Sequence, residues 1–263
     1  MNNYVTSMRA SDGSIVKLEC HNALHSTARL AKEYAKLGYP DRYVVLAEER
    51  QMLDADGHFK GDTEKGVFLS CILRPSIFPS QAALISSLAT VAMVTALEEH
   101  TMNDIGIGWV SNVYCNGSLI GNASIEGKLD NFTSYEYIIV NFSVILDENN
   151  FPPRVTDLIK KVFESESSSV GVIIAKNILN KFFHFYRDLK DHAKYMDIYR
   201  NKFLLRGHKI KYVTDGKKET CKVLGVDPEN CSLKVENPQK KVVLISTPTK
   251  VIIPKKIKKT IKN

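Results

Sequence analysis

Apolar residues recur at helical spacing in four stretches of this chain. Residues 81–100 have the widest apolar face, as expected for a helix that packs on a sheet. Ser26 or Thr27 is a suitable N-cap for a shorter helix, which Gly38 and Pro40 end. Residues 155–164 and 172–188 are the other two predicted helices.

Runs of β-forming residues lie between these helices. A polar, glycine-containing loop is expected from residue 51 to residue 66. Asn116-Gly117 favours a two-residue hairpin turn, because both central residues of such a turn need positive φ. The order of the elements predicts an α+β fold. The predicted strands are at residues 18–21, 43–48, 67–73, 109–115, 119–126 and 135–146.

The pattern changes near residue 205 to short, closely spaced strands, with strong turn sequences such as Asn237-Pro238 between them. This spacing predicts a small β-barrel of about 50 residues. We therefore expect a main domain at residues 1–204, a C-terminal barrel at residues 205–254 and a disordered lysine-rich tail at residues 255–263. The predicted barrel strands are at residues 209–213, 220–226, 232–235 and 241–246.

Composition narrows the class of protein. The 263 residues are 44% apolar and 25% charged, which is typical of a soluble globular protein. The net charge is +7, but five lysines in residues 255–263 account for most of it, so the rest of the chain is only weakly basic. We expect no sequence-specific nucleic-acid partner. The tail lysines are Lys255, Lys256, Lys258, Lys259 and Lys262.

The five cysteines are scattered and have no metal-ligand spacing, which favours a reduced cytoplasmic protein without a metal site. No apolar run reaches the roughly 18 residues that a membrane span needs, so no membrane partner is expected.

Several motifs occur in a recognisable order. His25-Ser26-Thr27 is followed by Ala47-Glu48-Glu49-Arg50-Gln51, by the segment at residues 66–75, and by a hairpin that begins Gly108-Trp109-Val110-Ser111-Asn112. This order resembles that of biotin protein ligases, in the biotin and lipoate ligase superfamily, over nearly the whole chain from His25 onward. The resemblance implies a class II synthetase-like fold, with a mixed, mainly antiparallel sheet flanked by helices and a small C-terminal SH3-like barrel. It also implies that the family's optional N-terminal DNA-binding domain is missing.

The family's reaction joins biotin to ATP and then passes the acyl group to a lysine of a carrier domain. Cations and backbone N–H groups must hold the phosphates, and the family supplies both from a Gly-Arg-Gly-Arg-Arg-Gly loop. The matching segment at residues 53–58 is shorter and places Asp54 and Asp56 where the family has arginines. Near a phosphate, this replaces attraction by repulsion worth several kcal/mol.

The tryptophan hairpin has lost charges as well. Gly108 and Leu119 stand where the family has two lysines, and Asn112 and Asn122 are further motif positions that differ. Lys60, Lys65 and Lys128 are nearby in sequence, either as substitutes or as solvated loop charges. We therefore expect no catalytic residues, and biotin, ATP and Mg²⁺ as ligands only if ligase activity survives.

Four residues keep the types found in the family's biotin pocket: Ser26, Thr27, Gln51 and Trp109. Hydroxyl and amide groups of this kind hydrogen-bond a ureido ring in an apolar slot. Each residue also has a structural alternative, since Ser26 and Thr27 suit a helix cap and Trp109 suits a core.

Three hypotheses about function remain. The first is a biotin-ligase-like binding or regulatory protein without ligase activity, whose partner is a carrier domain, an authentic ligase or a small ligand. The second is an active ligase or acyltransferase of the superfamily with a rebuilt ATP site. The third is an assembly subunit that uses the fold for protein interaction, and the resemblance implies a possible homodimer. Loss of the charged motifs favours the first and third.

Overall fold

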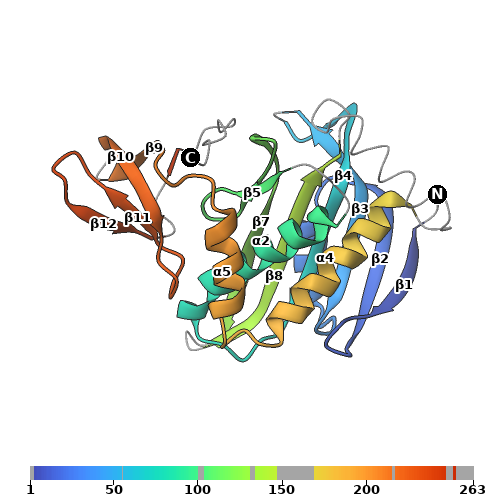
Figure 1. Cartoon of the computed structure of the whole chain (residues 1–263). Helices are drawn as coiled ribbons and strands as arrows, with labels where there is room; N and C mark the ends of the chain where they lie inside the picture. The colour runs from blue at the N-terminus through green and yellow to red at the C-terminus, as the bar shows by residue number, and fades with distance from the viewer. Residues whose placement is uncertain are drawn as a thin grey trace.

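The computed structural model describes residues 3–54, 56–99, 104–130, 134–146, 169–214, 217–246 and 251–252. A sheet of eight strands forms its centre: β1 (Tyr4–Arg9), β2 (Ile15–Leu24), β3 (Tyr43–Leu53), β4 (Phe59–Leu73), β5 (Ile105–Ile107), β6 (Asn112–Cys115), β7 (Ser118–Asp130) and β8 (Ser134–Ile145). Their spatial order is β1-β2-β3-β4-β8-β7-β6-β5 (Figure 1). Strands β2 and β3 are parallel, and the other neighbours are antiparallel.

Helices cover both faces of this sheet. Helix α1 (Thr27–Lys36) packs on β3, β4 and β8 from one side. Helices α2 (Ala82–Glu98), α4 (Val170–Tyr186) and α5 (Ala193–Lys202) lie on the other side (Figure 1). A short 3₁₀ turn at Pro79–Gln81 precedes α2. Because α2 contacts the sheet, α4 and α5 together, it is buried along nearly its whole length.

The C-terminal residues form a second, antiparallel sheet. Its strands are β9 (Lys209–Thr214), β10 (Lys217–Val226), β11 (Leu233–Glu236), β12 (Val242–Ile245) and β13 (Val251–Ile252), in the order β12-β11-β10-β9-β13. The inward side chains of this sheet join the same hydrophobic cluster as Trp109 and α2. The sheet is consistent with the predicted barrel-like unit, while the division of the chain near residue 205 stays a prediction.

The predicted fold class is confirmed, because the main sheet is mixed and mainly antiparallel and helices flank it. Two local expectations are also confirmed. The Ser26 hydroxyl caps α1 by accepting from the Arg29 N–H at 3.1 Å. Asn116 and Gly117 have φ of 48° and 80°, as the hairpin turn requires.

The predicted loop at residues 51–66 was wrong. Strands β3 and β4 run through most of it, and Gln51 pairs with Thr63 in the ladder. Backbone pairing stabilises these polar strands, although they lack the apolar alternation that predicts a strand. Trp109 lies before β6 rather than within a strand. The elements β1, β5, α5 and β13 were not predicted.

Some predicted features lie outside the described residues, namely the helix at residues 155–164 and the tail at residues 255–263. Within the described part of the chain, no helix combines the length and apolar character needed to cross a bilayer.

Candidate functional site

A connected set of polar side chains lies on the α1 side of the main sheet. In strand register, Ser70 of β4 is opposite Asn141 of β8, which is opposite Ser124 of β7. Thr27, the first residue of α1, has its hydroxyl 2.8 Å from that of Ser70. Ser70 donates to Asn141 Oδ1 at 2.8 Å, and Asn141 Nδ2 donates to Ser124 Oγ at 3.4 Å. We call these four residues the polar row.

The directions of these hydrogen bonds follow from donor counting. A serine hydroxyl has one hydrogen, and Ser70 gives it to Asn141, so Thr27 must donate to Ser70. The row runs from the buried Thr27 and Ser70 to the half-buried Asn141 and the exposed Ser124. It therefore presents an amide and a hydroxyl at its open end, and the network behind them holds their orientation.

Sequence reasoning found Thr27 but missed the roles of Ser70, Asn141 and Ser124. A signal was present, because Ser70 and Asn141 each lie between apolar neighbours within a strand. A polar residue at such a position needs a hydrogen-bond partner.

The other predicted pocket residues are placed differently. The Ser26 hydroxyl is used by the cap of α1. Gln51 is half-buried on β3, where it pairs with Thr63 of β4 beside an irregularity of the strand register. The structure thus brings Thr27 into the polar row, whereas the Ser26 hydroxyl is used by the helix cap and Gln51 lies in the β3–β4 ladder.

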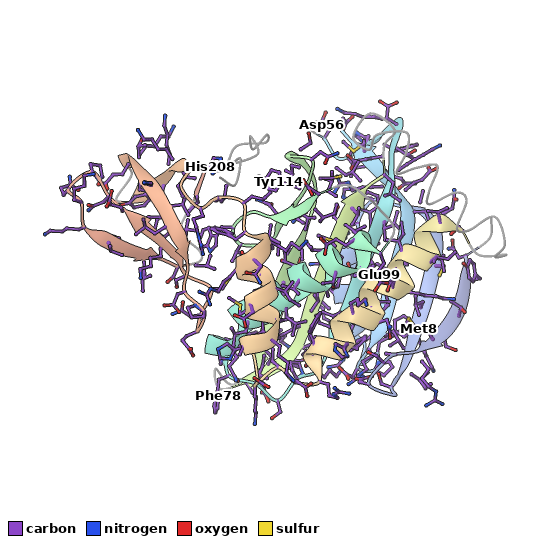
Figure 2. All side chains as sticks on the ribbon, in the orientation of Figure 1. Met8, Asp56, Phe78, Glu99, Tyr114 and His208 are labelled. Atoms are coloured by element: carbon purple, nitrogen blue, oxygen red, sulfur yellow. The ribbon has the colours of Figure 1, made fainter. Side chains whose placement is uncertain are left out.

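The segment that matches the phosphate loop is a closed turn at the tip of the β3–β4 hairpin. Asp54 Oδ1 accepts from the backbone N–H groups of Asp56 at 2.9 Å and His58 at 2.8 Å. The Asp54 N–H donates to the His58 carbonyl at 2.8 Å, and Gly57 turns the chain with φ of 87°. Figure 2 shows Asp56 at the outer edge of the molecule. A carboxylate already occupies N–H groups that a phosphate would need, so these residues do not fit a triphosphate.

Trp109 is part of the core. Its side chain is buried, and its indole N–H donates to the Cys231 carbonyl at 2.8 Å. The next carbonyl, that of Val110, accepts from the Tyr199 hydroxyl of α5 at 2.7 Å. Burial raises the pKa of Tyr199 well above its ordinary value, so this hydroxyl stays protonated. The start of the hairpin is therefore held between α5 and the second sheet.

Gly108 occupies a position with no room for a longer side chain. A Cβ atom there would lie 2.7 Å from a ring carbon of Tyr114. Tyr114 is itself buried, and burial raises its pKa to about 12. The lysine that the resemblance places at this position could be accommodated only if Tyr114 moved.

The remaining positions that differ from the family's motifs, Asn112, Leu119 and Asn122, lie in different surroundings. Leu119 is half-buried, packs against the main core and lies opposite Tyr114. Asn112 pairs with Asn122, which in turn pairs with Ser143 of β8. Asn122 is exposed and lies two residues before Ser124 on the same side of β7. Leu119 thus completes the core, whereas Asn122 extends the polar surface.

Several cations around this side of the sheet are bound by carboxylates. Lys60 and Lys65 are exposed on the hairpin strands. Lys128, the third lysine near the motifs, is paired with a glutamate, and its pKa is raised by that contact. The ion pairs are Arg50 with Glu64, Lys32 with Glu126 at 3.2 Å, and Lys128 with Glu136 at 2.5 Å.

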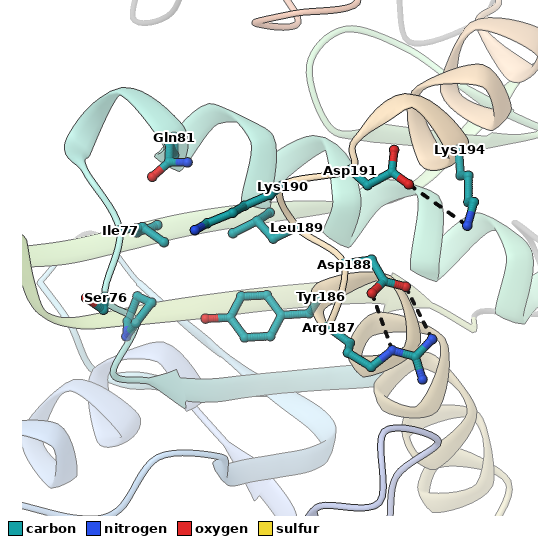
Figure 3. A pocket seen from close by; sticks show the side chains of 11 residues that line it. Ser76, Ile77, Gln81, Tyr186, Arg187, Asp188, Leu189, Lys190, Asp191 and Lys194 are labelled. Carbon is teal, nitrogen blue, oxygen red and sulfur yellow. Dashed lines mark hydrogen bonds and ion pairs between the residues drawn. The ribbon is translucent and has the colours of Figure 1, made fainter.

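A separate cavity of about 540 Å³ lies between the chain after β4 and the junction of α4 with α5 (Figure 3). It is at the opposite end of β4 from the hairpin tip. Asp188 pairs with Arg187 at 3.2 Å and Asp191 with Lys194 at 4.0 Å, so its carboxylates are neutralised. In the described part of the chain, no cluster of three or more His, Cys, Asp or Glu side chains is suited to hold a metal.

Known proteins of similar sequence are ligases. The chain is 27% identical over 181 residues to the bifunctional ligase/repressor BirA of Bacillus subtilis, covering 66% of this chain and 54% of that protein. It is 24% identical over 180 residues to BirA of Bacillus spizizenii, covering 65% and 54%. The chain thus spans about half the length of these curated relatives. No protein-family model matches it.

Solved structures show the same fold. A biotin protein ligase from Aquifex aeolicus in complex with biotin and ATP has a TM-score of 0.63 and 16% identity, covering 89% of this chain and 98% of that one. The fold of this chain is that of biotin protein ligases. A biotin protein ligase-like protein of unknown function from Silicibacter has a TM-score of 0.60 and 16% identity, covering 88% and 94%. At 16% sequence identity, these similarities establish that the chain shares the fold of these proteins, but not that it shares their activity.

Proposed function

We propose that this biotin protein ligase-like chain is a binding protein that has lost adenylation and transfer activity. Its ligand is biotin or a related cyclic urea at the polar row, and its macromolecular partner is a biotin carrier domain. The closed turn at Asp54 is the observation that most directly supports the proposal, because it replaces a phosphate site by a carboxylate bonded to its own backbone.

The hairpin on the other side supports the same proposal. Gly108 is packed against Tyr114, and Leu119 packs on the core, so neither position presents a cation to a ligand. Without cations, the negative charge that develops during adenylation would lack stabilisation, and this is usually the largest contribution to such catalysis.

The polar row supports retained binding of a small ligand. Thr27, Ser70 and Asn141 form a network of directed hydrogen bonds that ends in groups able both to donate and to accept. A ureido group needs both kinds of partner, and preorganised partners lower the entropic cost of binding.

Calorimetric titration with biotin, ATP and biotinyl-adenylate, followed by a carrier-labelling assay, tests the proposal. We expect biotin to bind, ATP not to bind, and a biotin carrier domain to stay unlabelled in the presence of biotin, ATP and Mg²⁺. An authentic ligase serves as the positive control for the carrier.

A pair of threonine variants locates the ligand. Thr27→Val keeps the shape of the side chain but breaks the polar row, so biotin should bind about tenfold more weakly. Thr95→Val removes a hydroxyl that bonds within α2 and should leave binding unchanged. Labelling of the carrier would establish an active ligase with a rebuilt ATP site. Failure of biotin and of the carrier domain to bind would leave an assembly subunit as the better account.

A further inference from the structure

Five lysines share the outward side of the second sheet. Lys209 of β9 lies directly opposite Lys222 of β10, and Lys211 is the next outward residue of β9. These exposed residues alternate with buried ones such as Ile210 and Cys221. We call the set the lysine face: Lys209, Lys211, Lys218, Lys222 and Lys234.

Negative charge on this surface is small. Among the described outward residues of β9, β10 and β11, Glu236 is the one carboxylate. It is directly opposite Lys222 in the ladder and lies 3.5 Å from Lys240. A further cation is added by Arg206, whose Nη2 lies 3.8 Å from where a Cβ of Gly225 would be. Gly225 is the residue opposite Lys234, so the guanidinium lies beside the lysine face.

This arrangement has an energetic cost in the free protein. Directly opposed residues of an antiparallel pair have Cβ atoms about 5 Å apart, and like charges there are destabilising. Lys209 and Lys222 are such a pair. A bound polyanion would relieve their repulsion and would also gain free energy by releasing its own counterions.

The side chains of the lysine face suit one kind of polyanion. The exposed apolar residues Val242 and Leu244 lie on the edge strand β12, where Leu244 is directly opposite Lys234. Two aliphatic side chains at one edge are a small apolar surface for anchoring in a bilayer. Protein interfaces are depleted in lysine and enriched in aromatic residues, which is the reverse of this surface. Lysine binds phosphate as a point charge, and a row of lysines matches a chain of phosphodiesters.

We propose that the lysine face binds the phosphate backbone of nucleic acid without sequence preference. Its described outward residues include no aromatic, asparagine or glutamine side chain that would stack on or read a base. The second sheet stands beyond α5, away from the polar row (Figure 1), and the proposal does not depend on the proposed function.

Fluorescence anisotropy of the full chain with two DNA duplexes of unrelated sequence tests this inference. We expect both duplexes to bind with equal affinity within about twofold. The plot of log K against log salt should have a slope of about −4, as expected for four to five phosphate contacts. A marked preference for one sequence, or binding that salt does not weaken, would overturn the proposal.

Two matched triple variants locate the surface. Lys209→Gln with Lys222→Gln and Lys234→Gln should weaken binding at least about tenfold near 0.1 M salt and make the salt slope shallower by about 3. Lys17→Gln with Lys36→Gln and Lys60→Gln removes as much charge from exposed positions elsewhere and should change affinity less than about twofold. Circular dichroism checks that both variants keep the fold. Equal loss in the two variants would show that general charge, not this face, binds DNA.

Other outcomes identify other partners. If replacing the lysines of residues 255–263 by glutamine abolishes binding while the lysine-face variant still binds, the tail is the binding element and the proposal is wrong. Tighter binding to phosphatidylserine vesicles or to polyglutamate than to DNA at the same salt would likewise overturn it.

Discussion

The indole N–H of Trp109 donates a 2.8 Å hydrogen bond to the main-chain carbonyl of Cys231, 122 positions later in the chain. Both residues are buried, and Cys231 has a φ of 58° in the turn before β11. The bond joins the start of the tryptophan hairpin to the second sheet inside one hydrophobic cluster. A buried carbonyl that lost this donor would have no water to replace it.

Trp109→Phe tests the importance of this bond. The substitution leaves the Cys231 carbonyl unpaired and creates a cavity, so the free energy of unfolding should fall by about 2–4 kcal/mol in urea denaturation. Phe78→Leu changes an aromatic residue that is 70% exposed and should alter stability by less than about 0.5 kcal/mol. Similar small effects for both variants would argue that the two sheets are held together elsewhere.

Gly108→Lys restores the residue type of the family but should damage the fold. The new Cβ would lie 2.7 Å from the Tyr114 ring, and forced repacking of this kind costs about 1–3 kcal/mol. Ser111→Lys adds the same side chain at a half-buried position of the same segment and serves as the control. Urea denaturation of both variants measures the difference, and equal stabilities would contradict the prediction.

Asp54→Ala should loosen the tip of the β3–β4 hairpin. It removes the acceptor of the Asp56 and His58 N–H groups, at a cost of about 0.5–1.5 kcal/mol for exposed bonds of this type. Asp54→Asn retains a side-chain oxygen and should behave like the unmodified chain. Hydrogen exchange at the two amides gives the measurement, and faster exchange is expected in the alanine variant alone.

Restoring two cations should not restore a ligase. Asp54→Arg with Leu119→Lys supplies positive charges at two positions where the family has cations. The loop at the hairpin tip is still shorter than the family's, and position 119 still packs on the core. We expect no labelling of a carrier domain above the unmodified chain. A parallel assay with an authentic ligase shows that the carrier domain can be labelled. Labelling of the carrier domain by the double variant would refute the prediction.

Tyr114 should make stability sensitive to alkaline pH. Burial raises its pKa from 10.0 to about 12, so folding favours the protonated phenol. Its contribution is therefore complete below pH 10 and is lost as the pH rises from 10 towards 12. Tyr114→Phe does not titrate, so between pH 10 and 11 its free energy of unfolding should fall by about 1 kcal/mol less than that of the unmodified chain. Urea denaturation at both pH values checks this, and parallel losses would exclude Tyr114 as the source.

Features that depend on neighbouring residues in the chain were predictable. The Ser26 cap and the Asn116-Gly117 turn follow from local hydrogen bonding and allowed φ values. The hairpin strands around Gln51 were missed because their pairing joins polar residues that show no alternation. Helix α5 was also missed, since contacts with α2 and β5 stabilise it rather than a strong apolar periodicity of its own.

Part of the candidate site was predictable for the same reason. Thr27 was found because it lies in a recognisable motif, whereas Ser70, Asn141 and Ser124 come together only through strand register. Register is a long-range property, and it places residues of three strands side by side.

The order of the main elements, the caps and turns, and the absence of the family's cations at residues 53–58, Gly108 and Leu119 were established without the structure. These properties are local, so residue type and spacing are sufficient to establish them. Three other features became visible in the folded chain alone: Asp54 closes a hairpin, Trp109 bonds to Cys231, and lysines of a weakly basic protein gather on one side of a sheet. Net charge and motif order contain no information about which side chains become neighbours, because packing and strand register determine that.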